Sequence, residues 1–543
     1  MIGPSRITMF SLVFAAVGTV SGAARHTIAA NANEHDATSA TGLRRAAPLA
    51  PPTNLTASSA TSSAVALAWT GDQTGKVAVE RKVLGAAWLV PSATARATAE
   101  KPTPSTLGVV TAAILTDSNI DAFTTYVYRV RGVGANNVLS VPSNELIVGP
   151  PPVGFTSVIA TPKAMQEHDA SQFANQIRMT FDANGDPSLA YLTYDLNNDG
   201  ESEDTDLSMI TWNRAKYRWN AAVVIDTTGN VVHSGTRRPL AIARDASTGM
   251  FGVLHLIGEH ELRLSTSSDG GMTWKHTRVD RSSSEEPGFS TPGLAMAAGR
   301  SYVAYAAGTS VLYKSGLMTD AVNKWTTAKA PLLPDTEGRS ECVNMVLDAA
   351  GKPIVSYCLA GEAYNTIVSV WRPDVGKTVK IMDTNHKQND DPGLDMISVG
   401  SQLAVAMYGA RDEHFFANHH LWFSRSTDAG ATWSTPVVVA DDGGNAMDAP
   451  ITVMLDRTGH PAMVANMGGG NDGATKCGVP KLMRSTDGVK WSTCAPETKG
   501  APPTADVAVP VGAFAGNDKL YVAFKVRAST PGLPAGLALW RER

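Results

Sequence analysis

Short runs of alternating apolar and polar residues fill most of the chain, separated by Gly, Pro, Asn and Asp. A period of two is typical of β-strands with one buried face, and the residues between the runs favour tight turns. Between residues 50 and 149, the runs predict a β-sandwich of about 100 residues. They read NLTAS, AVALAWTG, KVAVERK, YVYRVRGVG and NELIVGP. The hydrophobic pattern therefore predicts an all-β chain.

From residue 154 to residue 543 a larger unit recurs, in which an apolar strand, a turn with Gly and a second apolar strand come first. A third strand and a shorter fourth complete most units. Repeats of about 50–60 residues with four strands each predict a β-propeller, with seven blades preferred and six possible. The last unit is one strand short. Residues 154–162, GFTSVIATP, are expected to supply its outer strand and so remove a free sheet edge.

The segments outside these two regions have other roles. Residues 1–23 have the form of a signal peptide: a short region with Arg6, an apolar stretch and small residues for cleavage. The apolar stretch is shorter than the roughly 20 residues of a spanning helix, so we expect no membrane span. Residues 24–49 predict a disordered leader and residues 150–153 a Pro-rich linker. The expected location is secreted, extracellular or periplasmic.

Composition narrows the partners and the redox environment. The chain has 543 residues, which predicts more than one domain, and 46 basic against 50 acidic residues. Without a basic excess we expect no nucleic-acid partner. Cys342 and Cys358 flank a predicted hairpin, and Cys477 and Cys494 flank a repeated motif, which predicts two local disulfides. A metal site is the alternative, although no pair has the close spacing typical of zinc sites.

A motif of the form Ser-x-Asp-x-Gly-x-x-Trp occurs in SSDGGMTW and STDAGATW, and a shortened copy in STDGVKW. In a tight turn between third and fourth strands, the Asp and Ser side chains can accept or share hydrogen bonds with backbone amides. The Gly takes a conformation that other residues avoid, and the Trp packs between blades. We therefore predict structural roles for these residues: Ser267, Asp269, Gly271, Trp274, Ser426, Asp428, Gly430, Trp433, Ser485, Asp487 and Trp491.

These motifs resemble the Asp boxes, or BNR repeats, of sialidase-like β-propellers, and the resemblance covers residues 154–543. Residues 50–149 resemble a fibronectin type III domain through the opening Pro-Pro, Trp69 in the second strand and TTYVYRVRGVG, with Tyr126 as its corner tyrosine. The sialidase resemblance implies that the Asp boxes lie opposite the active face. The polar loops between second and third strands and between blades would then form that face.

Sialidases bind a sugar carboxylate with three arginines and use a Tyr nucleophile activated by a Glu. The segment TRRPLAIARD resembles the family motif of the first arginine and implies Arg237, although Arg238 takes the middle position. The segment SECVNMVLDAAGKPIVSYC resembles the one with the catalytic Glu and implies Glu341. The arginine expected after it falls on Tyr357 or Cys358, and the third arginine and the Tyr have no match. The alternative is a rim salt bridge or turn role.

Two neighbouring loops hold further candidates for acid–base catalysis or metal binding, of which His414 is the one selected for catalysis. They are His386, Asp390, Asp391, His414, His419 and His420. Adjacent strand residues point to opposite faces, so at most one of the last two faces a common site. The alternative is that these are ordinary surface histidines.

The loop DLNNDGESEDTD has the ligand spacing of an EF-hand or dockerin calcium loop. The predicted ligands of a structural Ca²⁺ ion are the side chains of Asp195, Asn197, Asp199 and Asp206 with the backbone carbonyl of Glu201. Glu203 stands at the ninth position. The alternative is an acidic solvated loop.

Two functions are consistent with these patterns. The first is a secreted sialidase-like glycoside hydrolase, exo-sialidase-like in type, and the second is a non-catalytic propeller that binds glycans or proteins outside the cell. Glycans or polysaccharides are the expected partners, and a monomer is assumed.

Overall fold

The computed structural model describes residues 49–71, 75–88, 106–134, 137–160, 177–195, 204–228, 240–258, 260–282, 289–331, 340–360, 366–383, 393–410, 419–441, 451–465, 481–492, 507–526 and 536–543. Within these ranges the regular elements are β-strands, with one 3₁₀ turn at Val322–Lys324. The chain is all-β, as the alternating pattern predicts. No helix in the described part has the length and apolar character needed to cross a membrane.

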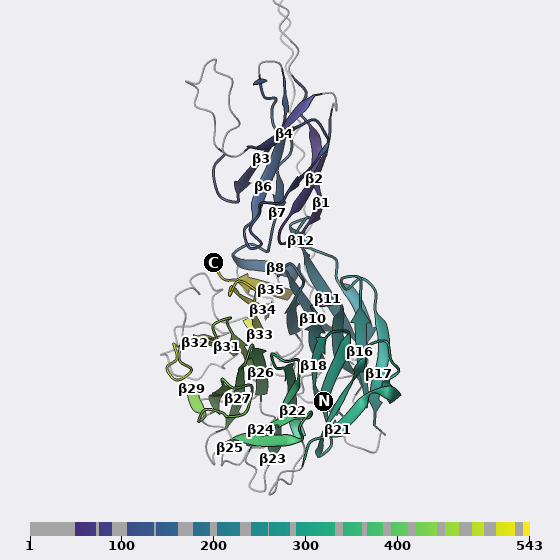
Figure 1. Cartoon of the computed structure of the whole chain (residues 1–543), viewed down its shortest axis with the longest axis vertical. Helices are drawn as coiled ribbons and strands as arrows, with labels where there is room; N and C mark the ends of the chain where they lie inside the picture. The colour runs from purple at the N-terminus through teal and green to yellow at the C-terminus, as the bar shows by residue number, and fades with distance from the viewer. Residues whose placement is uncertain are drawn as a thin grey trace, which may run out of the picture. The chain divides into compact units, whose positions relative to one another are not determined.

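The strands before residue 149 pair into two antiparallel sheets (Figure 1). One sheet has the order β1 (Thr53–Ala60), β2 (Val65–Thr70), β5 (Ile114–Asp117). The other has the order β4 (Thr106–Val110), β3 (Lys76–Val83), β6 (Tyr126–Val133), β7 (Leu146–Val148). Their facing residues, Leu67, Val79 and Tyr128 among them, are buried in one core. The Tyr126 hydroxyl accepts a hydrogen bond at 2.9 Å from the backbone N–H of Asp121, which ties the start of β6 to the preceding loop.

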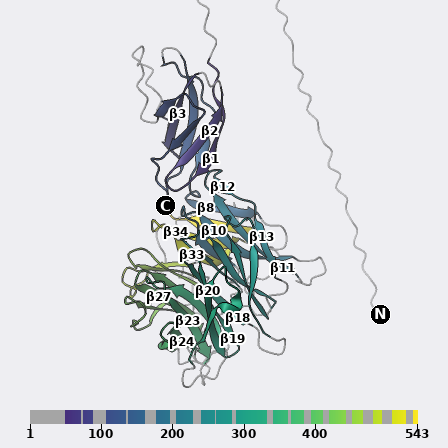
Figure 2. The same ribbon diagram turned by 45° about the vertical axis from the view of Figure 1, so that its right-hand side comes forward.

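Seven antiparallel sheets follow among the described residues (Figure 1; Figure 2). The first three are β9 (Ile177–Phe181) to β13 (Val223–Thr227), β14 (Leu240–Arg244) to β17 (Lys275–Arg281), and β18 (Phe289–Ala297) to β21 (Thr326–Lys329). The next two are β22 (Ser340–Leu347) to β25 (Lys377–Asp383) and β26 (Gly393–Val399) to β29 (Val437–Asp441). The last two are β30 (Ile451–Leu455) to β32 (Lys481–Arg484), and β33 (Val507–Phe514) to β35 (Gly536–Arg541) with β8 (Gly154–Ala160).

The remaining strands of these sheets lie between the first and last strands just given. They are β10 (Pro187–Asp195), β11 (Asp204–Asn213), β12 (Arg218–Trp219), β15 (Phe251–Ile257), β16 (Glu261–Ser267), β19 (Arg300–Ala307), β20 (Ser310–Leu317), β23 (Pro353–Ala360), β24 (Thr366–Arg372), β27 (Gln402–Ala410), β28 (His419–Ser426), β31 (Pro461–Ala465) and β34 (Leu520–Val526). In each sheet the first strand is apolar and pairs with the second strand.

The sheets form a ring, an arrangement of β-propeller type. The first strands of successive sheets are neighbours all the way from β9 through β14, β18, β22, β26 and β30 to β33, and β33 is again a neighbour of β9. Leu189 of the first sheet and Tyr521 and Leu537 of the seventh share one buried cluster. The early strand β8 pairs antiparallel with the late strand β35, as the missing outer strand predicts. Both ends of this region therefore meet in one sheet, in which β8 takes the place of the fourth strand.

Two kinds of aspartate-stabilised turn lie at the same end of the sheets, because connections in an antiparallel sheet alternate between its two ends. The first kind joins first and second strands: Asp182, Asp245, Asp348 and Asp456 each accept a backbone N–H within their own turn. The second kind is the predicted Ser–Asp turn. Asp269 accepts the N–H of Met272 and of Thr273, both at 3.0 Å. We call this end of the ring the turn end and the opposite end the rim.

The Ser–Asp turns also contact the preceding sheet. Gly271, with φ of +92°, lies against Met209 of the first sheet, and Gly488, with φ of +72°, lies against Phe423 of the fifth. A side chain is disfavoured there by backbone strain and by the neighbour. Trp491 packs edge-on to Phe423 at 5.0 Å between ring centres. These turns hold neighbouring sheets together.

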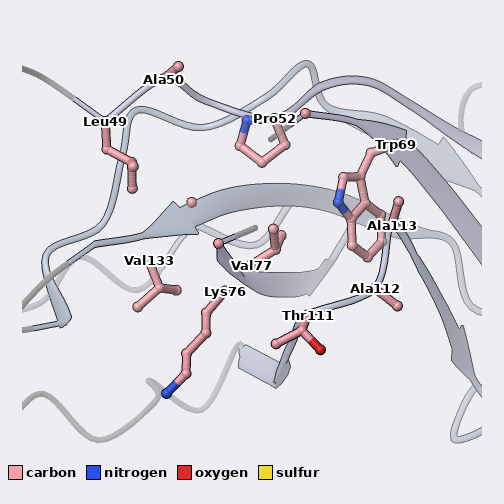
Figure 3. A pocket seen from close by; sticks show the side chains of 13 residues that line it. Leu49, Ala50, Pro52, Trp69, Lys76, Val77, Thr111, Ala112, Ala113 and Val133 are labelled. Atoms are coloured by element: carbon pink, nitrogen blue, oxygen red, sulfur yellow. The ribbon is translucent and has the colours of Figure 1, made fainter. Parts of the chain in front are cut away.

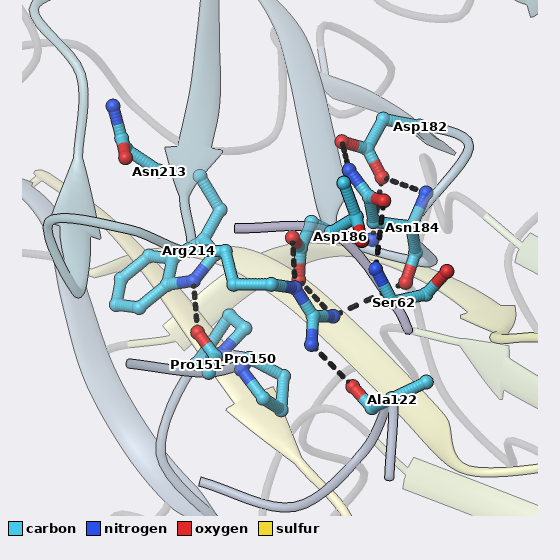
Figure 4. A network of polar contacts seen from close by, with 12 residues as sticks. Ser62, Ala122, Pro150, Pro151, Asp182, Asn184, Asp186, Asn213 and Arg214 are labelled. Atoms are coloured by element: carbon cyan, nitrogen blue, oxygen red, sulfur yellow. Dashed lines mark hydrogen bonds and ion pairs between the residues drawn. The ribbon is translucent and has the colours of Figure 1, made fainter. Parts of the chain in front are cut away.

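Residues 49–543 form one compact unit, and Arg214 links its two groups of strands (Figure 4). The guanidinium donates to both carboxylate oxygens of Asp186, at 2.8 and 2.9 Å. It also donates to the carbonyl of Asn184 at 3.1 Å and to that of Ala122, which precedes β6. Arg541 donates to the carbonyl of Phe123 at 2.7 Å. Two buried arginines thus bind carbonyls of the first group to the ring.

The predicted disulfide between Cys342 and Cys358 is present, and the two residues are directly opposite each other on β22 and β23. Both are buried. The predicted partners Cys477 and Cys494 lie outside the described residues.

Candidate functional site

Most of the residues predicted for catalysis lie outside the described residues. Arg237 and His414 are among these, as are His386, Asp390 and Asp391. Around Arg237 the described residues end at Thr228 and resume at Leu240. Around His414 they end at Ala410 and resume at His419. The structure therefore brings neither Arg237 nor His414 into a described site.

The backbone of Glu341 is described, its side chain is not. It is the second residue of β22, which is the first strand of its sheet and a neighbour of the first strands β18 and β26. Because β22 runs from the rim to the turn end, Glu341 lies at the rim. The next residue, Cys342, is joined to Cys358, so the backbone beside Glu341 is covalently tied to the second strand.

His420, one of the histidines proposed for catalysis or metal binding, has a buried side chain. It is 1% exposed on β28, with its ring 5.8 Å from the ring of Trp422. The side chain of its neighbour His419 lies outside the description. His420 is therefore buried within the fifth sheet.

The predicted calcium loop is described only at its base. Asp195 pairs with Asp204 across β10 and β11, and residues 196–203 lie outside the described residues. Asp206 is two residues inside β11, opposite Thr193, and its Oδ1 accepts a hydrogen bond from the Thr227 hydroxyl at 2.9 Å. Within the described part of the chain, His, Cys, Asp and Glu form no group of three suited to a metal.

A charged cluster missed by the sequence analysis joins the first and second sheets near the rim. The Asp226 carboxylate of β13 accepts hydrogen bonds from Nη1 of Arg263 at 2.8 Å and interacts with Nε2 of His255 at 3.1 Å. Arg263 also donates to Glu261. Burial opposes ionisation of Asp226, but the bonds from His255 and Arg263 outweigh it and lower the pKa to about 2. Burial lowers the pKa of His255.

The same arrangement recurs one sheet later, which indicates a structural role. Asp280 of β17 binds Lys314 of β20 at 2.9 Å and accepts a hydrogen bond from the Tyr305 hydroxyl of β19. Burial raises the pKa of Tyr305, and Asp280 adds to the shift. An Asp near the end of one outer strand thus forms hydrogen bonds with side chains of the second and third strands of the next sheet. The signal in the sequence was an Asp at this place in VVIDT and again in HTRVDR.

Two hollows lie among the described residues. The first is in the sandwich, beneath Leu49, Trp69 and Val77 (Figure 3), and its volume is about 50 Å³. This is room for a water molecule or two and not for a sugar. The second, of about 480 Å³, lies at the turn end between the sixth and seventh sheets. Its size falls within the roughly 300–1,000 Å³ that small-molecule sites occupy.

The larger hollow, which we call the turn-end groove, combines charged and aromatic side chains. Its lining includes Asp456, His460, Arg484, Lys490, Trp491 and Phe514. They come from the β30–β31 turn, from β32 and its Ser–Asp turn, and from the end of β33. Of these residues, only Trp491 was predicted from the sequence to have a role. The repeated first turn, seen in DANGDP, DAAGKP and DRTGHP, was the signal that could have pointed to Asp456 and His460.

No family model matches the chain, and no curated protein does. Among solved structures, the chain is similar to the SapL1 lectin in complex with α-methyl fucoside, with 14% identity, 61% of this chain and 100% of that chain covered, and a TM-score of 0.35. It is similar to the Hadza microbial sialidase Hz136, with 11% identity, 74% and 90% covered, and a TM-score of 0.33. It is also similar to the GH93 α-L-arabinofuranosidase of Fusarium graminearum with arabinobiose, with 12% identity, 72% and 97% covered, and a TM-score of 0.39. Likenesses this weak assign no activity.

Proposed function

We propose that this chain is an exported glycoside hydrolase of sialidase-like type, in which a seven-bladed Asp-box propeller follows a fibronectin type III-like module. The proposal treats the seven sheets of the ring as blades and the strands β1–β7 as the module. Glycans are its substrates, and the rim is its working face. Export agrees with the buried disulfide between Cys342 and Cys358, since such bonds persist in oxidising compartments.

The position of Glu341 carries the proposal. It begins an inner strand at the rim, and the adjoining disulfide holds its backbone in place. Catalytic groups need this kind of rigid support, because misplacement by about 1 Å can cost 100-fold in rate. The turn end, by contrast, is filled with aspartates such as Asp269 and Asp348 that are used up in closing turns. Those aspartates are committed to the fold, so the catalytic carboxylate of this proposal is Glu341 at the rim.

Each predicted catalytic residue has a role in this scheme. Glu341 activates the nucleophile or acts as general base. Arg237, which precedes the inner strand β14, binds a sugar carboxylate through its planar fork of N–H donors. His414, between β27 and β28, serves as a proton donor or acceptor near neutral pH.

The test is hydrolysis by the purified full chain, with sialosides, arabino-oligosaccharides, fucosides and acidic polysaccharides as substrates and mass spectrometry of the released sugars. Glu341→Gln is compared with Glu261→Gln, a carboxylate at the same end that is already bound to Arg263. We expect turnover that is lost in Glu341→Gln by at least about 100-fold and kept in Glu261→Gln. Turnover that survives in Glu341→Gln would remove that residue from the mechanism.

The alternative function is a recognition propeller without catalysis. The observation in its favour is the turn-end groove, where aromatic and charged side chains line a space of ligand size far from any rim carboxylate. Binding of one of the glycans with no released sugar from any of them would decide for this alternative.

A calcium ion is part of the proposal for the first sheet. Asp195, Asn197, Asp199 and the carbonyl of Glu201 would hold it, with Asp206 at the base of the loop. Hard oxygen ligands in this number suit Ca²⁺, and its role would be to order the β10–β11 connection. Calorimetric titration of the chelator-treated chain with Ca²⁺, beside Asp199→Ala, tests the site; equal heats in both would dismiss it.

A further inference from the structure

The turn-end groove lies away from the rim and is lined by side chains that the proposed hydrolase mechanism does not use. It lies between the sixth sheet, of which β30, β31 and β32 are described, and the seventh sheet. Ser492, which follows Trp491, forms an isolated antiparallel bridge with Arg484 of β32. The neighbouring seventh sheet supplies the opposite wall through Phe514.

Arg484 on one wall is held in a fixed orientation. Its Nη2 donates to Oε1 of Glu542 at 2.6 Å, and Oε2 of Glu542 accepts the backbone N–H of Leu520 at 3.0 Å. The guanidinium carbon lies 5.9 Å from the centre of the Phe514 ring. Arg484 still has 29% of its side chain exposed, and Nη1 makes no hydrogen bond within the described part of the chain. A rigid, partly exposed guanidinium edge therefore faces available space.

His460, from the β30–β31 turn of the same sheet, is also oriented by its neighbours. Its Nδ1 lies 2.8 Å from the Thr458 hydroxyl and 3.1 Å from Oδ2 of Asp456. Burial opposes ionisation of Asp456, but hydrogen bonds from Thr458 and His460 lower its pKa, so it stays a carboxylate. With Nδ1 engaged and 47% of the side chain exposed, His460 keeps Nε2 available to a ligand.

Trp491 adds a rigid aromatic surface. Its Nε1 donates to the carbonyl of Gly488 at 3.3 Å, and its ring packs against Phe423. The indole N–H is thus already satisfied, so that what Trp491 adds to the groove is apolar ring surface. Together with Phe514 it provides two aromatic side chains in one hollow.

The balance of charge in the groove decides the ligand class. Arg484 is matched by Glu542 and His460 by Asp456, and the charge of Lys490 acts on the nearby carboxylate of Asp487. The groove therefore has donors and acceptors side by side. Sugar hydroxyls both donate and accept, and sugar rings have an apolar face that packs on aromatic rings. A polyanion would find no such match. We infer that the turn-end groove is a second glycan site, which binds a neutral saccharide of one or two rings with vicinal hydroxyls.

This site does not depend on the rim being catalytic. It would hold the protein on a glycan while the rim acts on another part of it, so that its loss lowers retention on polymeric material without altering hydrolysis of a small substrate.

The experiment is a titration of the full chain with neutral probes, methyl α-fucoside, arabinobiose, lactose and cellobiose, followed by saturation-transfer NMR and calorimetry. Sialyllactose is the anionic comparison. We expect at least one neutral probe to bind, and more tightly than sialyllactose. His460→Ala and Arg484→Lys should weaken that binding by about tenfold or more, which corresponds to one good hydrogen bond. Arg484→Lys keeps the charge beside Glu542, so the fold is preserved.

Arg457→Ala is the matched control. Arg457 is next to Asp456 but is paired with Asp518 and does not line the groove, so binding should be unchanged. Glu341→Gln should also bind normally, because it alters only the rim. The inference is overturned if no neutral probe binds, if binding survives both groove variants, or if Glu341→Gln abolishes it. The last result would assign all glycan binding to the rim and leave the proposed hydrolase intact.

Discussion

Removal of the Arg214 guanidinium leaves the buried Asp186 carboxyl group without the cation that is hydrogen-bonded to it. Both side chains are 2% exposed, and Arg214→Met keeps a similar volume while it removes the hydrogen bonds that the Arg214 guanidinium donates in Figure 4. Burial raises the pKa of Asp186 from 3.8 to about 6 even with Arg214 in place, against the hydrogen bonds from Arg214 that lower it. Without Arg214 the ionised carboxyl group of Asp186 loses the hydrogen bonds that stabilise it. Its pKa therefore rises further, and the group stays protonated near neutral pH.

The size of the effect depends on pH, and the sign follows from linkage. A carboxyl group whose pKa is raised on folding contributes stability that is present below about pH 4 and is lost as the pH rises. In the natural chain this loss ends near pH 6, where Asp186 ionises beside Arg214. In Arg214→Met the loss of stability continues above pH 6, by about 1.4 kcal/mol for each pH unit. Near pH 5.5 only hydrogen bonds are missing, worth about 2 kcal/mol. At pH 8 the deficit reaches about 4–5 kcal/mol, in the range for a broken buried pair.

Thermal unfolding followed by circular dichroism measures this. For a ring of about 390 residues the unfolding entropy is near 0.8 kcal/mol/K, so the melting temperature should fall by about 2–3 °C at pH 5.5 and about 5–6 °C at pH 8. Arg457→Met is the control, because the Arg457–Asp518 pair is 66% and 30% exposed and should cost less than about 1 kcal/mol at both pH values. Equal losses at the two pH values in Arg214→Met would refute the reasoning, since they would mean that Asp186 does not change its protonation.

Three further results are expected. Gly293→Ala should destabilise the ring by about 1–3 kcal/mol, because the new Cβ would lie 2.7 Å from the backbone nitrogen of the next sheet, whereas Gly516→Ala meets no atom within 4 Å and should be near neutral in urea unfolding. Replacement of both Cys342 and Cys358 by Ala should cost about 3 kcal/mol by the same assay, and no change would show that the bond does not form. Hydrogen bonds from Thr432 and Ser426 lower the pKa of Asp428 to about 2, so its contribution is present above about pH 4 and lost toward pH 2; acid unfolding of Asp428→Asn should show a weaker dependence on pH in that interval.

Some features follow from short-range pattern alone. Alternating residues on either side of a turn, as in IRMTFDANGDPSLAYLTYD, become β9 and β10, and the Cys342–Cys358 pair appears where a hairpin places its two strands in register. Residues of a Ser–Asp turn such as Asp269 are bound within four residues of each other. Local chemistry of this kind is fully written in the sequence, because every partner is a near neighbour in the chain.

Other features depend on which sheets become neighbours. Asp226 and Arg263 are 37 residues apart, and Arg484 and Glu542 are 58 apart, so no local pattern could pair them. The turn-end groove likewise exists only because the sixth and seventh sheets meet beside a turn that pairs by a single bridge. The sequence by itself determined the strands, their hairpins and the turns that close them, since those energies are local. Closure of the ring decided the inter-sheet ion pairs, the Arg214 junction and the groove, because burial between distant segments is set only when the whole chain packs.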